Sequence, residues 1–153
     1  MNSDHSSRSE GSLHRPSLLE KELTHEIIGA FYEVYNALGY GFLERLYKRA
    51  LEIALRRRGL IVEREFPIAV SFQGQEIGHH RLDMFVERRV VVEVKSTRQL
   101  TDADRRQLLS SVTAANLDVG LLLHFGPKAD FRRILGKRMP NVKRSDPEDR
   151  NDP

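Results

Sequence analysis

The sequence predicts an α/β protein, more specifically an α+β fold in which helices flank one small mixed sheet. Three observations lead to this class. Two helix-period segments come first, three strand-period segments joined by tight turns follow, and a further helix then precedes an apolar strand. An antiparallel meander followed by a helical crossover produces a mixed sheet covered by helices. The predicted order is α-α-β-β-β-α-β.

Two amphipathic helices are expected in the first third of the chain. Residues 24–38 carry apolar side chains at i, i+3, i+4 and i+7 spacing, with Thr24 as a candidate N-cap. The helix has an alternative, earlier start, because Ser17 and Glu20 have capping-box spacing. A second helix with a broad apolar face is predicted for residues 42–58, and glycines stand beyond the end of each helix.

The apolar period then changes to that of β-strands. Gln73-Gly74 and residues 87–89 are turn signals, and Pro67 indicates a bend or a sheet edge in the first strand. The third strand has the unbroken apolar character of a central strand. The three predicted strands are residues 60–72, 75–87 and 90–96.

The last part of the core is predicted as one helix and one strand. Residues 101–116 have helical periodicity, with Thr101 or Asp102 as the N-cap. Residues 118–125 form a short apolar strand, in which His124 is expected to be a buried histidine. Residues 130–135 are compatible with either a last helical turn or a strand.

Length and composition predict one domain with two disordered tails. The chain has 153 residues, of which 17–136 are expected to form the domain. Residues 1–16 are polar and residues 137–153 alternate charges and prolines, so neither segment buries enough apolar surface to offset its ordering entropy.

Composition also excludes several classes of protein. There is no Cys, which excludes disulfides and thiolate chemistry and leaves His, Asp, Glu and backbone oxygen as metal ligands. No apolar stretch is long enough to predict a membrane span, and no secretory signal is recognised, so a soluble cytoplasmic protein is expected.

The charge distribution is mildly basic. The net charge is +3, and arginines cluster at three places. These clusters are equally compatible with a phosphate-binding face and with an ordinary solvated surface. They are Arg56–Arg58, Arg88–Arg89 and Arg105–Arg106.

Two acids on a mostly apolar hairpin are the first sign of chemistry. A three-residue loop at 87–89 pairs Val86 with Val90, which sets Asp83 opposite Glu93 on one face. Lys95 lies on that same face, but it balances only half of the negative charge. A divalent cation bridging both carboxylates would supply the remainder; a solvated face beside arginines is the alternative.

Residues 41–47, GFLERLY, match the G-x-x-E-x-x-Y signature that gives the GxxExxY protein family its name. The order of further segments also resembles that family over about residues 22–126, including RLDMFVE, VVVEVKS and VGLLLHFG. The family is similar to a compact branch of the PD-(D/E)XK nuclease-like superfamily. The resemblance therefore implies a mixed sheet with flanking helices, in agreement with the order above.

The resemblance also implies a site for Mg²⁺ or Mn²⁺. Asp83 matches the D of the motif and Glu93-Val94-Lys95 match E-x-K. Catalytic roles are implied for Asp83, Glu93 and Lys95, and metal ligation for Asp83, Glu93, Glu44 and the Val94 carbonyl. Supporting roles are implied for Gln107, Tyr47 and Gly41.

The function predicted from this resemblance is metal-dependent hydrolysis of phosphodiester bonds in nucleic acid, with DNA favoured. The alternatives are a non-catalytic nucleic-acid-binding or complex-assembly module that retains the fold, and a small-molecule phosphoesterase. Because the predicted domain is small, sequence specificity would come from a homodimer, a protein partner or nucleic-acid structure.

Overall fold

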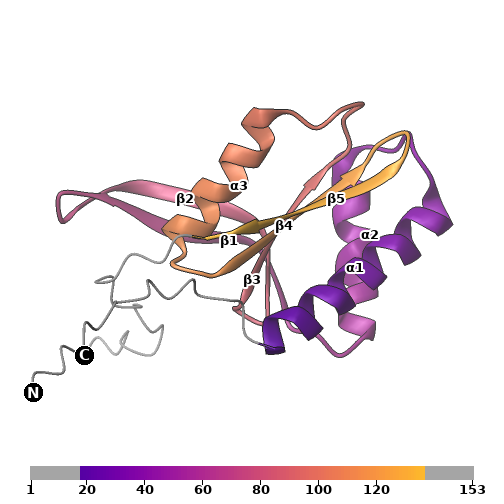
Figure 1. Ribbon diagram of the computed structural model, residues 1–153, viewed down its shortest axis with the longest axis horizontal. Coiled ribbons are helices and arrows are strands. Elements are labelled where there is room, and N and C mark those ends of the chain that lie inside the picture. Colours follow the sequence, from indigo (N-terminus) through magenta and orange to yellow (C-terminus); the bar gives the residue numbers. More distant parts are fainter. Residues whose placement is uncertain (1–17, 137–153) are drawn as a thin grey trace, which may run out of the picture.

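Helices cover both faces of one five-stranded sheet in the computed structural model of the protein, which describes residues 18–136 (Figure 1). The strand order is β1-β2-β3-β4-β5; β3 and β4 are parallel and the other neighbours antiparallel. The predictions for residues 1–16 and 137–153 lie outside the described residues. The elements are α1 (Leu18–Leu38), α2 (Glu44–Arg57), β1 (Val62–Phe72), β2 (Gln75–Val86), β3 (Val90–Lys95), α3 (Asp102–Ala114), β4 (Val119–Phe125) and β5 (Ala129–Leu135).

The mixed sheet with flanking helices confirms the predicted fold class. Helix α3 makes the crossover between the parallel strands β3 and β4, and β1, β2 and β3 form the expected meander. Pro67 lies on β1, an edge strand, where its missing N–H costs no ladder hydrogen bond on the outer side. Within residues 18–136, no helix has the length and apolar character needed to cross a membrane.

Three details differ from the sequence predictions. Helix α1 already includes Leu18, so Thr24 is not its N-cap; the Thr24 hydroxyl instead donates to the Lys21 carbonyl at 2.9 Å within the helix. Helix α2 begins at Glu44 rather than residue 42, after Leu43 in an extended conformation. Residues 129–135 form β5, a strand missing from the predicted order, because antiparallel pairing with β4 satisfies their backbone groups.

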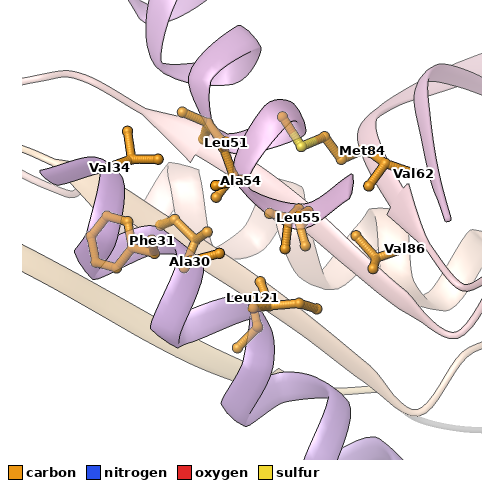
Figure 2. Close-up of a cluster of buried hydrophobic side chains, with 14 of the residues drawn as sticks. Ala30, Phe31, Val34, Leu51, Ala54, Leu55, Val62, Met84, Val86 and Leu121 are labelled. Atoms are coloured by element: carbon orange, nitrogen blue, oxygen red, sulfur yellow. The ribbon is translucent and has the colours of Figure 1, made fainter. Parts of the chain in front are cut away.

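The core has two parts, one on each face of the sheet. Helices α1 and α2 pack on one face through residues such as Phe31, Leu51 and Leu55, which meet Met84 and Leu121 of the strands (Figure 2). Helix α3 packs on the opposite face. The buried residues under α3 are Leu82, Phe85, Val91, Leu108, Val112, Leu117 and Leu122.

Gly120 on β4 lies directly under side chains of α3. A methyl group added at this position would lie 2.5 Å from Val112 Cγ2 and 2.9 Å from Leu108 Cδ1. Gly120→Ala is therefore expected to lower the free energy of unfolding by about 1–3 kcal/mol, as measured by urea denaturation. Ser110→Ala, on the exposed side of α3, is the control and should change stability by less than about 0.5 kcal/mol.

Candidate active site at the end of strand β3

The β2–β3 hairpin has the register that the sequence predicts. Its three-residue loop pairs Val86 with Val90, and the ladder continues to Met84 opposite Val92. The ladder stops there, one residue short of Asp83. Instead of a backbone carbonyl, the Asp83 carboxylate accepts the N–H of Val94 through Oδ2 at 3.0 Å. This side-chain bond holds the carboxylate of Asp83 against β3.

The neighbouring β1–β2 ladder is interrupted at the same height. Arg64 pairs with Met84 and Phe66 with Leu82, but Glu65 does not pair with Asp83 and has a φ of 51°. On the side of the interruption nearer the 87–89 turn, Met84 belongs to the core under α1 and α2. On the side nearer the tip of the β1–β2 hairpin, Phe66 and Leu82 pack under α3. The hairpin thus changes the face that carries its apolar side chains at Asp83, and this releases Asp83 from both ladders.

Glu93 is a buried acid beside Asp83. Its side chain is buried, with the residue 3% exposed, and its Oε1 atom has no hydrogen-bond partner among the described residues. Burial, followed by the charge of Asp83 and a side-chain hydrogen bond with it, raises the pKa of Glu93 to about 8, although Lys95 and Lys48 act in the opposite direction. A carboxylate in this position is incompletely compensated and is stabilised by a proton or a cation.

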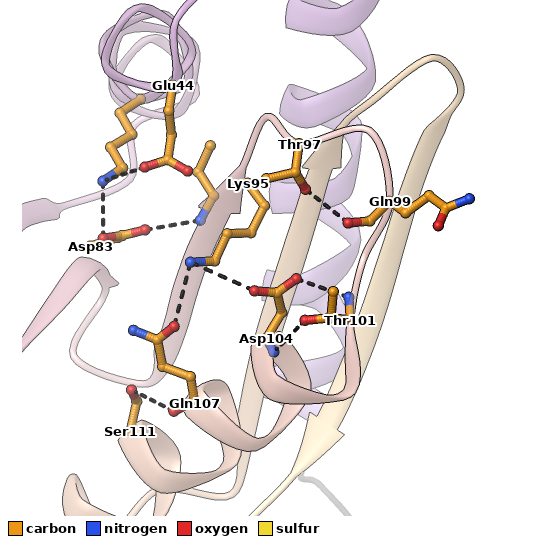
Figure 3. Close-up of polar contacts among 11 residues, drawn as sticks. Glu44, Asp83, Lys95, Thr97, Gln99, Thr101, Asp104, Gln107 and Ser111 are labelled. Atoms are coloured by element: carbon orange, nitrogen blue, oxygen red, sulfur yellow. Dashed lines mark hydrogen bonds and ion pairs between the residues drawn. The ribbon is translucent and has the colours of Figure 1, made fainter.

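Lys95 lies two residues along β3 from Glu93 and points toward α3 (Figure 3). Its Nζ donates to Gln107 Oε1 at 3.4 Å and lies 3.9 Å from Asp104 Oδ1. Asp104 is itself fixed by a capping box with Thr101 at the start of α3. The first turns of α3 therefore hold the amine of Lys95 at the end of β3.

The G-x-x-E-x-x-Y segment has a clear structural basis. Gly39 and Gly41 have φ angles of 67° and 119°, which favour glycine. The hydroxyl of the fully buried Tyr47 donates to the Gly39 carbonyl and accepts the N–H of Phe42 at 3.2 Å. The glycines and the tyrosine fix the loop between α1 and α2, and this loop places Glu44 in the first turn of α2, above Asp83 in Figure 3.

Lys48 is a residue of this site that the sequence analysis missed. Its Nζ lies 3.1 Å from Asp83 Oδ1 and 3.4 Å from Glu44 Oε2. Burial alone lowers the pKa of this amine, but the charges and hydrogen bonds of Asp83 and Glu44 outweigh burial and raise it. The i, i+4 spacing from Glu44 was visible in the sequence, whereas the contact with Asp83 depends on how α2 packs on the sheet.

The predicted metal ligands are therefore only partly assembled. Asp83 and Glu93 adjoin each other, but Lys48 stands between Asp83 and Glu44, and residues 18–136 contain no group of three acidic or histidine side chains arranged to hold a metal ion. The buried, unpaired Oε1 of Glu93 beside a second carboxylate nevertheless suits a hard divalent cation, which prefers oxygen ligands. Val94 is buried and contributes its N–H to Asp83.

The three strand histidines, His79, His80 and His124, do not join this cluster. His124 is buried on β4, as expected, and its Nε2 contacts the carbonyl of Thr97. His80 contacts the Ser111 hydroxyl at 2.7 Å, while its neighbour His79 lies 3.1 Å from Glu76. The two adjacent histidines thus have separate partners.

Most of the arginine clusters serve the fold. Arg58 pairs with Glu26 on α1, Arg88 with Glu63, and Arg89 with a further acid of α1. In contrast, Arg105 and Arg106 are exposed on α3.

Comparison with protein families matches residues 21–134 to the PD-(D/E)XK nuclease superfamily. Among solved structures, the crystal structure of a protein named SSO0001 has a similar fold, with a TM-score of 0.50 and 19% sequence identity over 76% of this chain. The match spans 59% of the length of SSO0001. No curated protein is detectably similar. The family match covers most of the chain, and the protein therefore belongs to the PD-(D/E)XK nuclease superfamily.

Proposed function

We propose that the protein is a divalent-metal-dependent nuclease that hydrolyses phosphodiester bonds, with DNA as the favoured substrate, and that it belongs to the GxxExxY branch of the superfamily. One observation carries the proposal. The buried carboxylate of Glu93 has an unpartnered oxygen beside Asp83, and Lys95 follows two residues later. Buried acids with strongly perturbed pKa values cluster at functional sites, and a bound cation would compensate this one.

In this proposal Asp83, Glu93, Glu44 and the Val94 carbonyl would hold Mg²⁺ or Mn²⁺. The bound ion supplies Lewis acidity, which acidifies water and offsets charge on the phosphodiester. Lys95 orients or deprotonates the attacking water and stabilises the pentacovalent phosphate. Gln107 and Asp104, which contact the Lys95 amine, fix its position.

Lys95→Ala tests this assignment. We expect the variant to lose Mg²⁺-dependent cleavage by at least about 10²-fold and to keep nucleic-acid binding, because Lys95 acts on the reacting phosphate and the fold does not depend on it. Wild type and variant are incubated with labelled single-stranded, duplex and branched substrates in Mg²⁺, Mn²⁺ or EDTA, and binding is measured in Ca²⁺.

Lys128→Ala is the matched control, since Lys128 is exposed in the turn between β4 and β5. It should cleave as the wild type does. If the wild type cleaves no substrate in either metal, or if Lys95→Ala cleaves at the wild-type rate, the nuclease assignment is wrong.

A non-catalytic nucleic-acid-binding or complex-assembly module is the second candidate. The observation that favours it is Lys48, an ammonium that already bridges two of the predicted metal ligands, Glu44 and Asp83. Metal-independent binding without cleavage by the wild type would support this candidate.

The proposal also includes how the protein finds its substrate. The region matched to the superfamily, residues 21–134, consists of the sheet and its three helices. Specificity would come from a homodimer, a protein partner or the structure of the nucleic acid, with the exposed Arg105 and Arg106 contributing phosphate contacts. The proposed location is the cytoplasm.

A further inference from the structure

We infer that Lys48 is the resident cation of the metal-free site, and that a divalent ion binds only by displacing the Lys48 amine from Asp83. This inference rests on the proposed function, because it concerns the metal that the nuclease would use. It assigns to Lys48 a role in setting the affinity of the site for metal.

Each carboxylate oxygen of Asp83 already has a partner in the metal-free protein. Oδ2 accepts the Val94 N–H at 3.0 Å, and Oδ1 lies 3.1 Å from Lys48 Nζ. Asp83 and Lys48 are both largely buried, with side chains 17% and 14% exposed. An ion bound to Oδ1 would share that oxygen with an ammonium group, and the repulsion between the two cations at this distance favours displacement of the amine.

The Lys48 amine also offsets the negative charge of the acids beside it. Lys48 is the amine in contact with two acids, Asp83 and Glu44, and Asp83 in turn adjoins the buried Glu93. Lys95, by contrast, is directed to Gln107 and Asp104 on α3. Removal of the Lys48 charge would leave the acids uncompensated in the metal-free protein.

A divalent ion and the Lys48 amine would compete for the carboxylate of Asp83. A divalent ion sits about 2.1–2.5 Å from a carboxylate oxygen, and an ammonium at 3.1 Å from the same oxygen would lie within a few ångströms of it. Lys48 has a long side chain and a second acid, Glu44, at 3.4 Å in the preceding turn of α2. The long side chain lets the amine leave Asp83 when the ion arrives, at a cost in metal affinity.

Lys48→Met tests the inference, since methionine keeps the length and helix propensity of lysine without its charge. Mn²⁺ binding to the full chain is measured by calorimetry, and melting temperature is measured in EDTA and in Mn²⁺. We expect the variant to bind Mn²⁺ at least about tenfold more tightly than the wild type. Its melting temperature should be lower than that of the wild type in EDTA and should rise more when Mn²⁺ is added.

Two further variants make the result specific. Lys48→Arg keeps the charge and should retain weak, wild-type-like Mn²⁺ binding. Arg45→Met removes an exposed charge from the same helix, outside the contacts of Asp83, and should change the affinity far less. Lys48→Gln repeats the neutral substitution with a polar side chain, in case Lys48→Met does not fold.

The possible failures are distinguishable. If the wild type binds Mn²⁺ and the neutral Lys48 variants bind it no more tightly, Lys48 is not the competing cation and only this inference falls. If neither the wild type nor the variants bind Mn²⁺, the proposed function falls as well.

Discussion

Glu93→Gln is expected to abolish Mg²⁺-dependent cleavage and, at the same time, to stabilise the metal-free protein at alkaline pH. The rate should fall by about 10³-fold or more, because a neutral amide is a poor ligand for a hard cation and no other side chain replaces the lost charge. The stability should rise because the amide removes a buried, incompletely compensated carboxylate.

The sign of the pH dependence follows from the pKa of Glu93. Folding raises this pKa from 4.5 to about 8, so between these values the folded protein binds more protons than the unfolded chain does. The contribution of Glu93 to the free energy of unfolding therefore falls as pH rises through this window. We expect wild type and Glu93→Gln to be similar at pH 4.5, and the variant to be more stable by a few kcal/mol, roughly, at pH 9.

Urea denaturation in EDTA across pH 4.5–9 measures this difference, and repetition in Mg²⁺ should remove it by stabilising only the wild type. Glu22→Gln, at an exposed position of α1, is the control, and its stability should stay close to that of the wild type across pH in both EDTA and Mg²⁺. A variant that is less stable than the wild type at pH 9 in EDTA would contradict the description of Glu93 as an uncompensated acid.

Glu52→Ala is expected to cause a large loss of stability. Glu52 is buried on α2, and its Oε1 accepts from Arg49 at 2.8 Å while its Oε2 accepts from Arg64 of β1 at 2.9 Å. Arg56 lies 3.3 Å from Oε1. Because removal of the acid leaves three guanidinium groups around an empty position, we expect the free energy of unfolding to fall by about 2–4 kcal/mol.

The contribution of Glu52 to the free energy of unfolding should change with pH in the opposite direction to the contribution of Glu93. Burial raises the pKa of Glu52, but the hydrogen bond from Arg64 and the charges of Arg56 and Arg49 outweigh it and lower the pKa below 4.5. The stabilisation is thus complete above 4.5 and is lost as pH falls through the lowered value. Circular dichroism during urea titration at pH 7 and pH 3 should show a smaller gap between wild type and variant at pH 3.

Glu63→Ala is a matched control, because Glu63 pairs with Arg88 at 2.7 Å near the surface, where ion pairs contribute little. Its loss should be below about 1 kcal/mol. Equal losses for Glu52→Ala and Glu63→Ala would show that the burial of Glu52 does not matter.

Local patterns in the sequence were enough to predict strands β1 to β4 and to bring Asp83 next to Glu93. The turn at 87–89 sets the register of β2 and β3, and strand alternation sets the face of Glu93 and Lys95, so both depend on neighbours in the chain. The family match confirms the superfamily from which the roles of these residues were inferred. Their catalytic roles remain predictions.

Contacts between elements could not be predicted in the same way. The position of Lys48 against Asp83 depends on the packing of α2, 35 residues away, and that of Asp104 against Lys95 on the packing of α3. Strand β5 was ambiguous because two consecutive exposed arginines, Arg132 and Arg133, interrupt its apolar alternation, and only pairing with β4 selects the extended conformation. At Thr24, two capping signals competed and the upstream one was nearer to the observed start of α1.

The interruption at Glu65 and Asp83 divides the β1–β2 hairpin into two parts. The base, residues 62–64 and 84–86, packs against the rest of the sheet, and the arm, residues 66–82, projects from it (Figure 1). The arm exposes Phe72 and Ile77 near its tip and depends mainly on its own two-stranded ladder. Short ribbons of this kind open at lower free energy than a central sheet does. Since Asp83 lies at the interruption itself, bending of the arm would tilt its carboxylate relative to Glu93 and Lys48.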